Sequence, residues 1–187
     1  MKLLTAGEQL TLKALADSFY EVVPLELRTY CALTSAISKA VLHHFAIQSR
    51  VVPCQLWCAA PKHNYVVGFV GNRKTDGKWD GHAICMAGNW LIDAALHHLQ
   101  TEFQIAVPPV ATVEVFTIPT HIIGRADLSN QHTIWWHKPP QGANTRLPKN
   151  PPSLVCEYAD RLIERLTDEA PLCREDQTHV LLSAAAP

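Results

Sequence analysis

The spacing of apolar residues changes near Ser49 in this 187-residue chain. Before that point apolar residues recur every three or four positions, which is typical of helices. After it come short segments rich in β-branched and aromatic residues, separated by Gly, Pro, Asn and Asp, which are typical of strands. Helical spacing returns after Pro152. Helices, then strands, then a helix predict an α+β fold on a mainly antiparallel sheet.

Three helices are predicted. Thr5-Ala6-Gly7-Glu8 matches a capping box, so the first helix should follow Thr5 and end near Tyr20. The second should begin near Thr29 or Tyr30 and end near Phe45, and its apolar circumference is typical of a central helix. The third should be capped by Ser153 and span 153–168. The residues predicted to face inward from the first helix are Leu10, Leu12, Leu15, Ala16 and Phe19.

Five strands are expected between the second and third helices, at 50–60, 64–70, 82–87, 89–96 and 111–118. Pro53 should lie at an edge or a bulge, because proline cannot donate to a sheet. The segment 124–152 is rich in Pro, Asn and Gln and is predicted to be a long loop in which only 134–136 pack inward. Residues 1–187 are interpreted as one domain, with its core at about 29–120.

Charge and hydropathy exclude several classes of function. The formal net charge is −1, with Arg and Lys scattered, so no nucleic-acid partner is expected. No stretch approaches the eighteen apolar residues of a membrane span, so no membrane association is expected. The first residues lack the layout of a signal peptide, which favours a cytoplasmic protein, although leaderless secretion would leave the same pattern. The six cysteines are expected to be free thiols.

The stretch GHAICMAGNWLID, residues 81–93, contains the first candidate functional pair. A two-residue turn at Gly88-Asn89 would pair Ala87 with Trp90 and place His82 and Asp93 on one face as diagonal neighbours. A turn longer by one residue would put them on opposite faces. On one face, the carboxylate can hold the Nδ1–H of the imidazole and leave Nε2 free to take a proton.

Cys31 is the candidate nucleophile for this pair. It lies in the first turn of the predicted central helix, where unpaired N–H groups and the helix dipole stabilise a thiolate. The same N–H groups could bind an oxyanion. A thiolate next to His82 is suited to acyl transfer through a thioester.

These residues resemble a known family, the transglutaminase-like core of the papain-like cysteine protease superfamily. Its typical signature is a Cys opening a helix, Gly-Ile-x-x-Arg at the helix end, His-Ala on a strand and Trp-x-x-Asp on the next. Cys31, the run 46–50, His82-Ala83 and the run 90–93 stand at the matching places. The resemblance covers about residues 29–97, with Ala46 where Gly is usual and a short hairpin between His and Asp.

The resemblance implies a papain-like fold with a Cys31-His82-Asp93 triad, no cofactor, and a protein or peptide substrate. It implies acyl chemistry on an amide, either hydrolysis or transfer to an amine, without distinguishing them. Relatives include peptidases, protein deamidases and crosslinkers, arylamine acetyltransferases and leader-peptide peptidases. Two alternatives remain open, a binding or regulatory protein on this fold with 138–152 as interaction surface, and an acyltransferase that uses a small-molecule thioester. The oligomeric state is not predicted.

Four further residues are weaker site candidates. Tyr30 and Gln55 could donate a hydrogen bond to an oxyanion, because papain-like enzymes commonly use a side-chain donor. Trp79 and Trp135 could border a substrate groove, because each is expected in a loop. For all the tryptophans, packing in the core or against a loop is the alternative interpretation.

A metal site is not expected. Cys54 and Cys58 stand four apart, with His63 and Cys85 nearby, but this spacing is no compact zinc motif and no second pair follows. Core cysteines are the favoured interpretation. The triad has alternatives of the same kind, because a helix cysteine can be a small buried hydrophobe and a strand-end aspartate can cap the next turn.

Overall fold

The computed structural model describes residues 2–61, 64–68, 81–116, 121–128, 131–143 and 145–169. It confirms the α+β class. Its helices are α1 (Ala6–Val22), a 3-10 turn η1 (Leu25–Leu27), α2 (Cys31–His44), α3 (His97–Phe103) and α4 (Pro152–Glu169). Its strands are β1 (Ser49–Ala59), β2 (Asn64–Val67), β3 (His82–Ala87), β4 (Trp90–Asp93), β5 (Ala111–Glu114), β6 (Ile122–Asp127) and β7 (Thr133–His137).

The strands form one antiparallel sheet in the order β5-β4-β3-β1-β7-β6, and β2 also pairs with β1. The long strand β1 joins its two halves, because its first part pairs with β3 and its second part with β7. Pairing with β7 begins only at Gln55, after Pro53. The outer strands approach each other where Phe116 N–H donates to Ile123 O at 3.0 Å, so the sheet is nearly closed.

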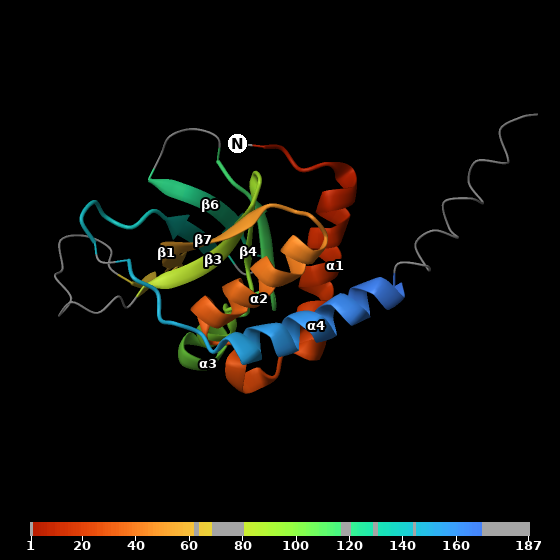
Figure 1. Cartoon of the computed structure of the whole chain (residues 1–187). Coiled ribbons are helices and arrows are strands. Elements are labelled where there is room, and N and C mark those ends of the chain that lie inside the picture. Colours follow the sequence, from red (N-terminus) through yellow and green to blue (C-terminus); the bar gives the residue numbers. More distant parts are fainter. Residues whose placement is uncertain are drawn as a thin grey trace, which may run out of the picture.

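Helices α1, α2 and α4 pack together, and α2 lies against the sheet (Figure 1). Apolar side chains fill two cores, one between these helices and the sheet and the other inside the curved sheet beneath α3. Alternation along β3 separates them, since Cys85 and Ala87 face the helices whereas Ile84 and Met86 face the interior. The start of α2, where Cys31 lies, is close to the segment that leads into α4 (Figure 1).

The predicted start of the first helix is confirmed. Thr5 Oγ1 accepts from Glu8 N–H at 3.3 Å, and Thr5 N–H donates to Glu8 Oε2 at 2.7 Å, which completes the capping box. Leu10, predicted to face inward, is 61% exposed, because the buried stripe runs through Leu12, Leu15 and Phe19. The last helix begins at Pro152, so Ser153 lies in its first turn and is not its cap.

The predicted long loop at 124–152 is wrong, because β6 and β7 occupy much of its first half. In the sequence, the Pro, Asn and Gln that suggested a loop stand between the residues of these two strands and after those of β7. Ile134 and Trp136 are fully buried, as expected of 134–136, and they alternate with half-buried Thr133 and Trp135. The signal for these strands was a period of two residues, which the Pro, Asn and Gln around it obscured.

Helix α3 was also not predicted. The strand expected at 89–96 ends at Asp93, whose Oδ1 accepts from Ala95 N–H at 3.1 Å and turns the chain. Seven residues of helix are too few to show a helical period.

Two residues after the end of α2, Ala46 has a left-handed backbone conformation with a φ of +58°. Ile47 N–H donates to Leu42 O at 2.9 Å and Ala46 N–H donates to His43 O at 3.1 Å, the two bonds of a Schellman motif. This position favours glycine, because a Cβ is strained there.

Replacing Ala46 by glycine should therefore stabilise the protein. The left-handed strain is worth about 1–2 kcal/mol and the added chain entropy of glycine offsets part of it, so a net gain of about 0.5–1 kcal/mol is expected. Urea unfolding measures it. Ala40→Gly, inside α2, is the control and should have the opposite sign. Equal losses in both variants would contradict the assignment.

Candidate active site

The hairpin at 82–93 has the predicted register. Ala87 pairs with Trp90, Met86 with Leu91 and Cys85 with Ile92 around a two-residue turn. Gly88 has a φ of +53°, and an added Cβ there would lie 2.6 Å from Lys2 O. The other turn residue, Asn89, accepts from Leu4 N–H at 3.2 Å and donates to Glu114 Oε1 at 2.8 Å. Contacts with the N-terminal segment and with β5 thus fix the two-residue turn, and the turn determines the register of β3 and β4.

His82 and Asp93 meet as this register requires. His82 Nε2 lies 2.7 Å from Asp93 Oδ2, and the residues are 1% and 0% exposed. The nitrogen is not the one predicted, because Nε2 and not Nδ1 faces the carboxylate. Nδ1 is therefore the ring nitrogen left for Cys31, whose side chain is close enough to contribute to the raised pKa of His82.

Two further donors hold Asp93. Trp136 Nε1–H donates to Oδ2 at 2.7 Å, and Ala95 N–H donates to Oδ1 at 3.1 Å. With His82, three groups converge on one buried carboxylate, which fixes its position. The role of Trp136 was not predicted. Its burial next to half-buried Trp135 in β7 was a signal for packing, not for this hydrogen bond.

The pair shifts both titrations towards the charged forms. Burial by itself would lower the pKa of His82, but the charge and hydrogen bond of Asp93, with a smaller contribution from Cys31, raise that pKa well above its ordinary 6.5. Burial would likewise raise the pKa of Asp93, but His82, Trp136 and Ala95 hold it below its ordinary 3.8. An imidazolium–carboxylate pair is therefore favoured at neutral pH.

Cys31 lies in the first turn of α2, as predicted; it is the first residue of the helix, and its side chain is half-buried. The structure brings it to His82 from the helix layer, whereas Asp93 comes from the sheet. The Cys31 N–H does not point to a vacant oxyanion site as expected, because it donates to Thr29 O at 3.1 Å. A donor for an oxyanion must therefore come from another group.

Gln55 has the properties of such a donor. It is 4% exposed, and its Nε2 has no hydrogen-bond partner among the residues that the structure describes. Its neighbour in β1, Cys54, pairs in register with His82. Alternation places Gln55 on the opposite face of β1 from Cys54 and His82, and in the described part of the chain no hydrogen bond joins it to His82 or Cys31. An unpaired buried amide is costly, which is a reason to look for a ligand at this place.

The other weak candidates have different outcomes. Tyr30 is the residue before α2 and is 60% exposed, at the rim of a cavity that Cys31 also lines. Trp79 lies outside the described residues. Trp135 points to the opposite face of β7 from Trp136, with the guanidinium of Arg125 4.7 Å from its ring centre. It belongs to a strand and not to the expected loop, and no contact joins it to His82 or Asp93.

His98, in the first turn of α3, is 7% exposed. Its ring centre lies 5.8 Å from that of His82, and its Nδ1 donates to Ala95 O at 2.7 Å. The turn that donates to Asp93 therefore also orients a second imidazole beside His82.

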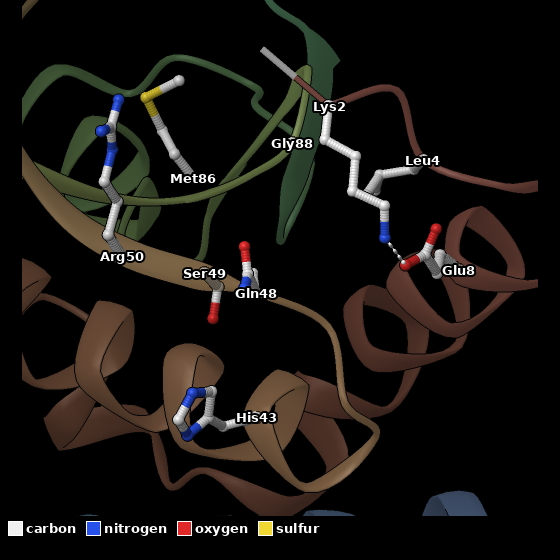
Figure 2. A pocket seen from close by; sticks show the side chains of 9 residues that line it. All are labelled: Lys2, Leu4, Glu8, His43, Gln48, Ser49, Arg50, Met86 and Gly88. Carbon is white, nitrogen blue, oxygen red and sulfur yellow. Dashed lines mark hydrogen bonds and ion pairs between the residues drawn. The ribbon is translucent and has the colours of Figure 1, made fainter.

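A separate cavity lies at the other end of α2 (Figure 2). His43 of α2 and Arg50 of β1 line it, together with Met86 and with Lys2, whose Nζ is 2.8 Å from Glu8 Oε1. It contains none of the three triad residues, so it is not part of this site.

The described cysteines are free thiols. Cys54, Cys58 and Cys85 are buried, which confirms them as core residues, and burial raises the pKa of Cys58 to about 11 and that of Cys85 to about 12. Within the described ranges no three His, Cys, Asp or Glu side chains gather in a way that could hold a metal ion.

The comparisons with known proteins give no match: no family model, no curated protein and no solved structure is significantly similar to this chain. In the part of the chain that the structure describes, no helix combines the length and the apolarity needed to span a bilayer.

Proposed function

We propose that this protein is a cysteine-dependent enzyme that acts on an amide through a thioester on Cys31. The observation that carries the proposal is the buried 2.7 Å His82–Asp93 pair, with Cys31 at the start of a helix near enough to His82 to raise its pKa. This is the arrangement of a nucleophile, a base and a group that orients the base. The α+β fold is compatible with a transglutaminase-like domain of the papain-like kind, which is part of the proposal.

The chemistry follows from these positions. The Cys31 thiolate attacks the amide carbon, and the carbonyl electron pair moves to oxygen. His82 gives its Nδ1 proton to the leaving amine as the C–N bond breaks and the thioester remains. His82 then takes a proton from water or from an acceptor amine, which attacks the thioester and releases Cys31. Asp93 holds the ring in place and stabilises its charged form throughout.

Gln55 is the proposed oxyanion donor. Its side chain is buried, its Nε2–H is unpaired among the described residues, and it follows Cys54, the residue of β1 that pairs with His82. A donor that is already desolvated and oriented stabilises negative charge without reorganisation. The Cys31 N–H is engaged with Thr29 O, so the side chain is the better candidate.

Selective alkylation tests the triad. With limiting iodoacetamide near neutral pH, mass spectrometry should find Cys31 modified well before exposed Cys156. His82→Ala should remove this preference. His44→Ala, an exposed histidine at the other end of α2, is the matched control and should keep it. Equal, slow modification of Cys31 and Cys156 would contradict the proposal.

Acyl capture tests the thioester. Wild-type protein mixed with p-nitrophenyl acetate should release a burst of p-nitrophenolate equal to the protein concentration, with the acetyl group found on Cys31. Cys31→Ser should show no burst. Alkylation at Cys31 without acyl capture would favour a binding protein with a reactive thiol over an enzyme.

A further inference from the structure

We infer that the substrate places a large apolar side chain, within one or two residues of the reacting carbonyl, in a cavity beside Cys31. This inference rests on the proposed function, because it identifies what the same cysteine would act on. The cavity has a volume of about 530 Å³, and Cys31 is among its lining residues. Volumes of this order are typical of sites that enclose a ligand group.

The lining is mostly apolar. Leu27, from η1, and Leu33, from α2, form one side, and Leu154, from α4, with Pro148 and Pro151 forms the other. Of the described residues that line the cavity, Lys149 alone carries a charge. A charged or strongly polar group would lose its hydration here and find few polar partners to replace it. An aliphatic or aromatic group would be stabilised by burial.

The walls of this cavity are held together. Asn150 Nδ2–H donates to Ala32 O at 2.9 Å, which ties the segment before α4 to the first turn of α2. That bond joins residues 118 positions apart in the sequence and lies next to the nucleophile. The cavity is therefore a built feature of the structure and not a gap between unconnected segments.

An exposed aromatic side chain also lines the cavity. Tyr30, the residue before α2, is 60% exposed. Exposed apolar groups around an apolar cavity are typical of a surface that a partner covers. Because Cys31 opens into the same space, the partner expected here is a peptide segment whose apolar side chain enters the cavity.

Alkylating probes with equal chemistry and different tails test this inference. We would measure the rate of modification of Cys31 by iodoacetamide, by N-hexyl iodoacetamide and by the analogue whose six-carbon tail ends in a carboxylate. The hexyl probe should react with Cys31 about tenfold faster than iodoacetamide, since burial of several methylenes is worth at least that factor. Cys156, exposed in the same chain, is the internal control and should show no preference.

Two variants test whether the preference of Cys31 for the hexyl probe arises in this cavity. Leu27→Asn and Thr29→Phe, which change the lining and fill the cavity, should each lower the ratio of the hexyl rate to the iodoacetamide rate at Cys31. Leu10→Asn alters an exposed leucine that lines a different apolar cavity, between α1 and the sheet, and should leave this ratio unchanged. The ratio is taken within one variant, so a change in the intrinsic reactivity of Cys31 cancels.

The outcomes separate the two proposals. A Cys31 that is no faster than Cys156 with iodoacetamide itself would overturn the proposed function. A fast Cys31 without tail preference, or with the carboxylate-tailed probe as fast as the hexyl probe, would overturn the apolar cavity alone. The second result would point instead to Lys149 as the recognition group.

Discussion

Asp93→Ala is expected to lower the free energy of unfolding by about 3–5 kcal/mol, which is the usual cost of removing one partner from a buried ion pair. The carboxylate is fully buried and accepts from His82, Trp136 and the Ala95 N–H. Without it, three buried donors lose their acceptor, and the charge of His82 has no counterion. Urea unfolding of both proteins at neutral pH measures the difference.

Milder and distant variants make this result interpretable. Trp136→Phe keeps an aromatic ring in the core and removes one donor from Asp93, so a loss of about 1.5–3 kcal/mol is expected. Asp127→Ala removes a carboxylate from the exposed Arg125–Asp127 pair and should leave stability unchanged. Equal effects of Asp93→Ala and Asp127→Ala would show that the buried network contributes nothing to stability.

The parts of the fold that sequence could predict are those with a strong local pattern. The capping box at Thr5 and the stripe on α2 specify helices through contacts a few residues apart. The strands β6 and β7 were missed because composition over the whole of 124–152 outweighed a period of two in short pieces. Helix α3 was missed because it is short and begins where the Asp93 side chain turns the chain.

In the candidate site too, sequence predicts the features that depend on local pairing and not those that depend on side-chain rotation or distant pairing. The two-residue turn at Gly88-Asn89 determines the register, so the nearness of His82 and Asp93 could be calculated from pairing alone. Which ring nitrogen faces the carboxylate depends on side-chain rotation, and sequence says nothing about it. The contribution of Trp136 depends on β7 pairing with β1 through a long connection, which no local pattern encodes.

The stability contributed by the His82–Asp93 pair is expected to fall as the pH rises above about 6.5. The pKa of His82 is raised in the folded protein, so its contribution is complete below 6.5 and is lost as the pH climbs towards the raised pKa. The pKa of Asp93 is lowered, so its contribution is present above 3.8 and is lost only in acid. The slope above neutral pH therefore belongs to His82, at up to about 1.4 kcal/mol per pH unit.

The comparison is made between two proteins that both carry Cys31→Ala, which removes the titration of that thiol. One is otherwise unchanged and the other also carries His82→Gln and Asp93→Asn, so the difference between their unfolding free energies isolates the pair. Burial raises the pKa values of the Cys54 and Cys85 thiols, so both stay neutral in the folded state of either protein between about pH 6.5 and pH 8.5. If the difference in unfolding free energy stays constant between about pH 6.5 and pH 8.5, His82 is neutral throughout that range. Asp93 then does not keep the imidazole of His82 protonated. The charged pair on which the proposed proton transfer depends would then be absent, even with the 2.7 Å contact in place.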